Sequence, residues 1–366
     1  MHWQNLLDLI SFIPTIILKP PLQQPNNFNI IRLAAAAFVI FSHSFGFYGR
    51  RDPVNIFSDG KIPGGQFAVY VFFLLSGYLI TSSWLKKEKI FPYLTKRVRR
   101  IFPALIVTVL ISIFLVGPAF TNLSIINYFY SSETYSYLWN ISLWKMKLTL
   151  PGVFTFDGVE HTVNPPIWTL FFEFLMYIIV ILFGLLKMFD RQKNSIYILW
   201  TFVLASLVLV LTKISPDLFI FKIGVANFIR FFLFFFAGAI FFIYFKGRKI
   251  KILFPVVFFA MMCVLRKTDF FFVPAFFFII TMVFHIAFQE KKYAERIVSY
   301  GDFSYGTYLY GYIVQNMVFQ FIGEKLNPWS LFIISLFVTL PLAILSWNFI
   351  EKKFLDKSSM AIKITS

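Results

Sequence analysis

The chain has little of what soluble, disulfide-linked or metal-binding domains require. Its 366 residues include one cysteine, Cys263, which excludes a disulfide framework and a site of clustered thiolates. Charged residues make up 14% of the chain, whereas soluble domains have about 25%. The four histidines are scattered and show no metal-ligand spacing. We therefore expect neither a soluble domain nor a metal site.

Long apolar runs take the place of these features. Hydrophobic residues make up 58% of the chain, and the mean hydropathy is +0.74. A bilayer-spanning helix needs about 20 apolar residues. Ten runs of roughly this length are predicted spans, at 29–48, 65–84, 101–120, 167–186, 195–212, 223–244, 252–265, 270–288, 304–323 and 329–350. The seventh is short. The pattern predicts an all-α polytopic membrane protein, with one domain over 1–366 and no fused soluble domain.

Two segments lie outside this pattern. Residues 5–18 are too short to span comfortably and contain Pro14, and no Lys or Arg precedes residue 19 to form the basic region of a signal peptide. We expect residues 1–28 to form an interfacial or re-entrant segment. Residues 121–166 form the one long connection between spans.

The basic residues predict an orientation. A net charge of +17 on a soluble protein would suggest nucleic-acid binding, but here the charges lie between apolar runs, and no nucleic-acid partner is expected. With the termini in the cytoplasm, the inner segments hold 22 of the 34 basic residues and the outer segments hold ten. The positive-inside rule therefore favours cytoplasmic termini and an extracytoplasmic 121–166 connection.

The first span carries two residues that are costly in lipid, Arg32 and His43. They are eleven residues apart, so they differ by only about 20° around a helix and lie roughly 16 Å apart along it. A shared face predicts a polar track through the membrane, with Arg32 near the cytoplasmic side and His43 near the outer side. His43 suits general-base chemistry on a hydroxyl. A structural histidine bonded to a neighbouring helix is the alternative.

The fourth span opens with Asn164-Pro165-Pro166-Ile167-Trp168 and carries a second polar face. Thr169, Glu173 and Tyr177 recur every four residues. Because this span runs inward, we expect Glu173 at a depth comparable to His43, where a first-span histidine or arginine would be its partner. Trp168 alone would be an ordinary interfacial aromatic.

A basic cluster precedes the third span. Arg97 and Arg100 share a helical face, and guanidinium groups bind phosphates. Such clusters also set topology or bind lipid headgroups, so that alternative stays open. In the second span, Ser76-Gly77 is typical of close helix packing.

Together these motifs resemble the acyltransferase-3 family of membrane acyltransferases, which modify bacterial surface and exported carbohydrates. The resemblance covers nearly the whole chain. Its elements are an Arg-x10-His pair at Arg32 and His43, an Arg-x-x-Arg motif at Arg97 and Arg100, FF-x-x-SG-[FY]-L over 72–79, Asn-x-x-x-Trp-[ST]-Leu-x-x-Glu over 164–173, and late motifs at 304–309 and 347–351.

The resemblance implies a multi-pass O-acyltransferase of the bacterial inner membrane. Cytoplasmic acyl-CoA, usually acetyl-CoA, would be the donor, and a carbohydrate or lipid-linked glycan hydroxyl would be the acceptor. It implies that Arg32, Arg97 and Arg100 hold the CoA phosphates, that His43 is the base and that Glu173 orients or charges it. The candidates for substrate contact are Ser76, Asn164, Trp168 and Tyr177.

Several alternatives stay open. Arg32, His43 and Glu173 also suit a transporter or flippase of a lipid-linked sugar, or a proton-coupled path, and a non-catalytic assembly subunit is a third class. Direct transfer and an acyl-histidine relay are not separated. The acceptor, which includes O-antigen and exopolysaccharide among its classes, is not readable. In the 121–166 connection, the candidates for acceptor contact are Trp139, Trp144, Asp157, Glu160 and His161.

Overall fold

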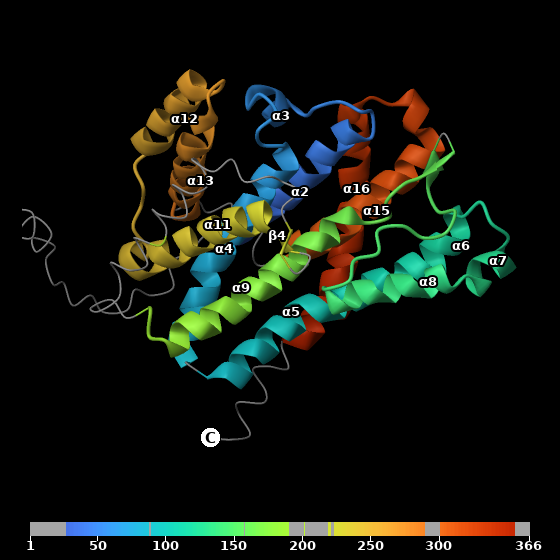
Figure 1. Cartoon of the computed structure of the whole chain (residues 1–366), viewed down its shortest axis with the longest axis horizontal. Helices are drawn as coiled ribbons and strands as arrows, with labels where there is room; N and C mark the ends of the chain where they lie inside the picture. Colours follow the sequence, from blue (N-terminus) through green and yellow to red (C-terminus); the bar gives the residue numbers. More distant parts are fainter. Residues whose placement is uncertain are drawn as a thin grey trace, which may run out of the picture.

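The computed structural model describes residues 27–87, 89–156, 158–189, 201, 219–220, 223–289 and 301–355. The predicted interfacial segment up to residue 26, the span at 195–212 apart from residue 201, and Asp157 lie outside them. The long helices are α2 (Phe28–Gly46), α4 (Gly64–Lys87), α5 (Ile90–Ile111), α9 (Trp168–Leu185), α11 (Val225–Phe245), α12 (Leu253–Leu265), α13 (Phe272–Ala287), α15 (Ser304–Ile322) and α16 (Pro328–Ser346). Figure 1 shows their arrangement.

Shorter elements extend or connect these helices. The π-helical turn η1 (Ser112–Val116) and α6 (Gly117–Phe120) continue α5, and η6 (Trp347–Glu351) continues α16. The other short helices are α3 (Pro53–Phe57), α7 (Ile125–Tyr130), α8 (Ser132–Ser136), η2 (Tyr137–Ser142), η3 (Pro165–Ile167), η4 (Asp269–Phe271) and η5 (Gly323–Lys325). Two antiparallel pairs of two-residue strands complete the described fold, β1 (Thr155–Phe156) with β2 (Val159–Glu160) and β3 (Phe219–Ile220) with β4 (Ile223–Gly224).

Seven helices in the described residues are long and apolar enough to cross a membrane. They confirm the predicted all-α polytopic class, while the count of ten and the orientation of the termini stay predictions. Helix α15 fills the predicted ninth span, but it is more polar because it buries Thr307, Gln315 and Asn316. Helix α12 fills the seventh with 13 residues.

The bundle has two ends, which we name after the residues of α2 that lie there. At the His43 end, the backbone N–H of Gly64, where α4 begins, donates to Asp52 (3.0 Å). At the Arg32 end, Arg100 of α5 and Arg32 both contact Asp302, which lies just before α15. Glu351, at the end of the α16–η6 segment, joins the same cluster. The described helices therefore run in the alternating directions that the sequence predicts.

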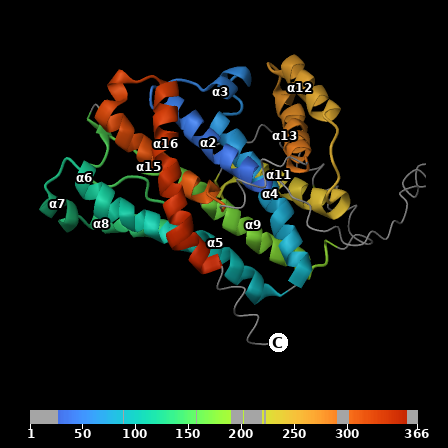
Figure 2. The ribbon, with the colours of Figure 1, turned by 180° about the vertical axis from the view of Figure 1, so that it is seen from behind.

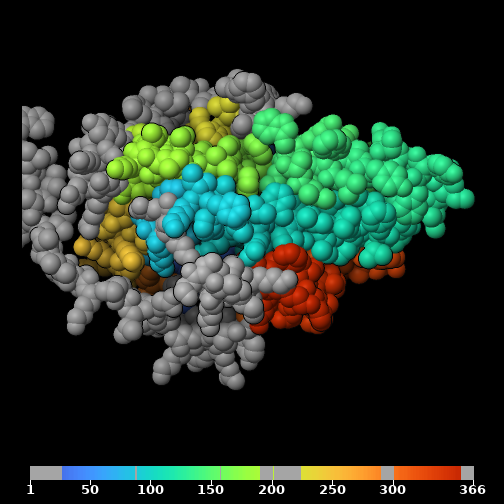
Figure 3. Space-filling view, turned by 90° about the horizontal axis from the view of Figure 1, so that it is seen from below, coloured from blue at the N-terminus to red at the C-terminus, as the bar shows by residue number. Residues whose placement is uncertain are grey.

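Helix α2 lies inside this bundle. It packs against α4, α15 and α16, and Figure 2 shows α16 crossing in front of α2 and α15. On another face, α5 lies between α9 and the end of α16 (Figure 3). The polar face of α2 is consequently turned toward protein, as the cost of ionisable groups in lipid requires.

Glycine allows α4 and α11 to approach closely. A Cβ atom on Gly77 would lie 1.7 Å from the carbonyl oxygen of Phe235, and one on Gly238 would lie 2.0 Å from the carbonyl oxygen of Leu74. Neither position can hold a larger residue without separating the helices. The packing interpretation of Ser76-Gly77 is confirmed for Gly77, because small residues bring membrane helices together.

The short helix α12 pairs with α13 at one side of the bundle (Figure 1). Lys61, in the α3–α4 loop, donates to the carbonyl of Arg266 (2.9 Å), which follows α12. At the opposite end of the pair, Nδ1 of His285 lies 2.7 Å from the carbonyl oxygen of Ile250. Helix α12 therefore extends between the same two ends as α13, and His285 has structural partners.

Candidate active site

A cavity of about 540 Å³ lies at the His43 end. His43 reaches it from the last turn of α2 and stands edge-on to Tyr312, with ring centroids 5.0 Å apart. The other polar or aromatic residues of its walls are Ser42, Arg50, Arg51, Asp52, Asn55, Gln66, Trp168, Thr169, Asn227, Phe231 and Tyr308. This volume falls in the range of small-molecule sites. An imidazole on such a wall can accept a proton from a bound hydroxyl.

Asp52 organises the wall next to His43. Its carboxylate is buried and accepts from the N–H groups of Val54 and Asn55 at the start of α3, from Gly64 at the start of α4, and from Ser42 Oγ of α2 (2.7 Å). One side chain thus fixes three helix ends around the cavity. Sequence analysis did not identify it. The sequence feature that could have indicated it is Asp52-Pro53, shortly after the His43 span, because Asp followed by Pro is typical of a capped helix start.

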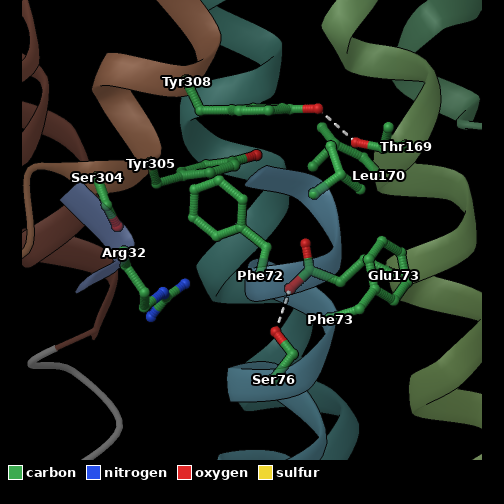
Figure 4. Close-up of a pocket in the computed structure, with 11 residues that line it drawn as sticks. Arg32, Phe72, Phe73, Ser76, Thr169, Leu170, Glu173, Ser304, Tyr305 and Tyr308 are labelled. Atoms are coloured by element: carbon green, nitrogen blue, oxygen red, sulfur yellow. Dashed lines mark hydrogen bonds between the residues drawn. The ribbon is translucent and has the colours of Figure 1, made fainter. Parts of the chain in front are cut away.

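A second, smaller pocket of about 40 Å³ lies deeper, between Arg32 and Glu173. Figure 4 shows Arg32 and Glu173 pointing into it from opposite sides, with Phe72 of α4 between them. Glu173 Oε1 accepts hydrogen bonds from Ser76 Oγ (3.2 Å) and from the hydroxyl of Tyr177. The predicted residues Arg32, Ser76, Glu173 and Tyr177 are therefore grouped together, in contact or around one pocket.

The predicted contact between Glu173 and His43 is not present in the described structure. Ser76, the partner of Glu173, lies twelve residues after Gly64, or roughly 18 Å along α4 from the His43 end. Glu173 thus lies at the depth of Arg32. The physical reason is that α9 begins deep in the bundle, because Pro166 just before it already accepts from Tyr308, which lies in the second turn of α15 from the Arg32 end (2.7 Å).

Arg32 and Arg100 are neutralised by carboxylates of their own chain. Arg100 contacts Asp302 (2.6 Å) and Glu351 (3.3 Å), and Arg32 contacts Asp302 (3.1 Å). Burial raises the pKa of the Asp302 carboxyl, but the two guanidinium groups and the hydrogen bonds from Ser304 outweigh burial and hold that pKa well below its usual range. The two arginines thus have two carboxylate partners within the bundle, as costly buried cations require.

Arg97 differs from its motif partner. It donates to Ser83 Oγ (3.0 Å) and lies over the rings of Tyr93 and Tyr177, with 5.6 and 5.8 Å to the ring centroids. No carboxylate of the described residues pairs with it, and its buried Nε has no hydrogen-bond partner there. Of the two motif arginines, Arg97 is the one whose charge remains available to an anion.

The remaining predicted substrate contacts separate into two groups. Trp168 lines the His43 cavity, as the prediction requires. Asn164 is buried, and its amide donates to the carbonyl of Leu309 (2.8 Å), so it ties the start of α9 to α15 and lines neither pocket.

The 121–166 connection contributes little to the cavity. Of its residues only Pro166 lines the wall, whereas Trp139 and Trp144 are exposed elsewhere and Glu160 accepts from the backbone of Gly152 (2.7 Å). The 50–66 segment supplies the polar wall instead, with Gln66 facing Asn227 of α11 (3.5 Å). Two sequence features could have indicated this wall. One is the charged run Arg50-Arg51-Asp52 after α2, and the other is the pair of single amide side chains, Gln66 and Asn227, inside two apolar spans.

The described residues hold no group of three His, Cys, Asp or Glu that could bind a metal ion.

Residues 26–348 match the family described as "Acyltransferase domain", acyltransferase-3. The chain is 30% identical over 352 residues to the "O-acetyl transferase" of Shigella phage Sf6, covering 94% of this chain and 100% of that protein. It is 31% identical over 181 residues to "Nodulation protein 10" of Rhizobium leguminosarum bv. viciae, covering 46% of each. No solved structure matches significantly.

Proposed function

We propose that this chain, which belongs to the acyltransferase-3 family and is a membrane O-acetyltransferase, takes the acetyl group from cytoplasmic acetyl-CoA and transfers it to a hydroxyl of a cell-surface or exported carbohydrate. The observation that carries the proposal is His43, an imidazole on the wall of a 540 Å³ cavity that also holds Trp168 and several hydrogen-bonding side chains. We place the protein in the bacterial inner membrane, with the His43 end outside.

The charge distribution supports donor entry at the Arg32 end. Arg97 lies there with a guanidinium that no described carboxylate neutralises, and a CoA phosphate is a suitable partner for it. Arg32 and Arg100 lie at the same end of the bundle but are held by Asp302. We therefore assign phosphate binding mainly to Arg97, and the positioning of the entrance to Arg32 and Arg100.

In this proposal, His43 is the general base of the transfer step. Its imidazole takes the proton of the acceptor hydroxyl while that oxygen attacks the carbonyl carbon of the thioester. The carbon–sulfur bond breaks, and the departing thiolate takes the proton from the imidazolium, so the products are an acetyl ester and free CoA. In the relay alternative, His43 accepts the acetyl group first and then passes it to the hydroxyl.

The cavity walls support a carbohydrate acceptor. Arg50, Asn55 and Gln66 offer both donors and acceptors for hydroxyl groups, and the indole of Trp168 offers an apolar face. Glu173, held by Ser76 and Tyr177, lies on the donor side and is assigned to orienting the donor.

The test is acetyl transfer by the purified, detergent-solubilised protein from labelled acetyl-CoA to glycans of the parent cell surface. His43→Ala should lower transfer by at least about a hundredfold, the range for loss of a general base, while its melting temperature stays near wild type. His285→Ala is the matched control, because that imidazole bonds to Ile250 and Gln289 away from both pockets.

Undiminished transfer by folded His43→Ala would refute the catalytic assignment. Transfer by the purified wild-type protein would exclude a transporter, which moves its substrate without acylating it. Mass spectrometry of protein incubated with acetyl-CoA alone separates the two routes, since only the relay leaves an acetyl adduct on His43.

A further inference from the structure

The His43 cavity and the small Arg32–Glu173 pocket meet at the same three side chains. Val69 of α4, Thr169 of α9 and Tyr308 of α15 line both. All three are at least nine-tenths buried. In Figure 4, Tyr308 and Thr169 close the upper end of the small pocket, joined by their hydrogen bond. A group that moves from the small pocket into the His43 cavity passes these three side chains.

The three side chains are held firmly. The Tyr308 hydroxyl donates to the carbonyl oxygen of Pro166 (2.7 Å), and its oxygen lies 2.5 Å from Thr169 Oγ1. Phe72 packs edge-on against the Tyr308 ring, with centroids 5.6 Å apart. Val69 and Thr169 are β-branched, so each has few rotamers with which to move aside. The passage is therefore narrow and stiff.

We propose that Val69, Thr169 and Tyr308 form a size filter that limits the transferred group to acetyl. The inference rests on the proposed function, in which the thioester approaches His43 from the Arg32 side. The adjoining pocket has a volume of about 40 Å³, which suits a group of few heavy atoms. A longer acyl chain brings more atoms past Val69, Thr169 and the ring of Tyr308, and close-packed interiors resist the displacement of such side chains.

The filter predicts which longer acyl donor each variant should accept. Val69→Ala removes two carbon atoms from the passage, the number by which butyryl exceeds acetyl. Thr169→Ser removes one carbon and keeps the hydroxyl that bonds to Tyr308, so it corresponds to propionyl. One methylene in a fitted pocket changes specificity by roughly 10- to 200-fold.

The experiment compares kcat/KM for acetyl-, propionyl- and butyryl-CoA with a fixed acceptor and purified protein. We expect Val69→Ala to raise the butyryl-to-acetyl ratio at least about tenfold, and Thr169→Ser to raise the propionyl-to-acetyl ratio by a similar factor. Val71→Ala is the matched control. It makes the same change two residues along α4 at a buried site that lines neither pocket, and its ratios should equal those of wild type.

Two negative results have different meanings. If the wild-type protein transfers no acyl group from any CoA donor, the proposed function fails. If wild type transfers acetyl but folded Val69→Ala and Thr169→Ser keep wild-type ratios, the filter is wrong while the function stands. Thr169→Ser guards against poor folding of Val69→Ala, because it preserves the hydrogen bond across the passage.

Discussion

Replacing the two arginines of the Arg-x-x-Arg motif should have different effects: loss of Arg100 should lower stability, and loss of Arg97 should weaken donor binding. Arg100 is 13% exposed and contacts two carboxylates, so Arg100→Ala leaves Glu351, which is 2% exposed, without its cation. Breaking a buried ion pair by removing one partner costs about 3–5 kcal/mol. Asp302 still pairs with Arg32 (3.1 Å) in this variant, so only Glu351 loses its cation. We therefore expect a loss of stability in the lower part of this range, about 3 kcal/mol.

Arg97→Ala removes a hydrogen bond to Ser83 and two ring contacts but strands no carboxylate of the described residues. Its effect on stability should be small, about 1 kcal/mol. Its main effect should be a higher KM for acetyl-CoA, because the unneutralised guanidinium is lost.

The assays are thermal unfolding of the detergent-solubilised variants and steady-state kinetics on the folded fraction. A second substitution tests the cause. Arg100→Ala combined with Glu351→Gln should be more stable than Arg100→Ala alone, because the stranded charge is gone. If Arg100→Ala melts like wild type and instead raises the KM for acetyl-CoA, the ion-pair interpretation is wrong and Arg100 binds the donor.

Three further outcomes follow from the packing and the charge cluster. Gly77→Ala should lower the free energy of unfolding by about 1–3 kcal/mol or more, because its Cβ meets the Phe235 carbonyl, whereas Gly46→Ala has open space and should melt like wild type. Asn164→Ala should cost about 1–3 kcal/mol through the lost amide bond to Leu309, and a raised KM for the acceptor without loss of stability would contradict this. Asp302→Asn should destabilise the protein most above about pH 4; because the folded-state pKa is lowered, the difference from wild type should shrink as the pH falls below that value.

Residue spacing was enough to predict several of the helices. The predicted first, second and fourth spans differ from α2, α4 and the η3–α9 segment by at most three residues at either end, because apolar runs of bilayer length leave few alternatives. The shared face of Arg32 and His43 also appears in the structure, with one residue at each of two pockets that meet. The third helix was predicted to begin at residue 101, but α5 begins at Ile90, because a basic segment at a membrane surface can still be helical.

Contacts between distant parts of the chain could not be predicted in this way. Arg32 and Asp302 are 270 residues apart, and Arg100 and Glu351 are 251 apart. Periodicity places each residue on a face of its own helix but does not say which helix that face meets. The same limit applies to the walls of the His43 cavity: the sequence pointed to the 121–166 connection for acceptor contact, whereas the short 50–66 segment supplies most of the polar wall of this cavity.

The position of Glu173 also limits how the two halves of the track can cooperate. His43 lines the 540 Å³ cavity, and Glu173 lines the smaller pocket, where it bonds to Ser76. The described hydrogen bonds of Glu173 go to Ser76 and Tyr177 and not to the imidazole, and the carboxylate on the same cavity wall as His43 is Asp52. In the proposed mechanism, general-base chemistry at His43 would therefore draw its electrostatic support from the 50–66 segment, and Glu173 would act on the donor. The polar face of α2 thus reaches two separate pockets that share Val69, Thr169 and Tyr308, and on our proposal these three side chains set the size of the group that crosses between them.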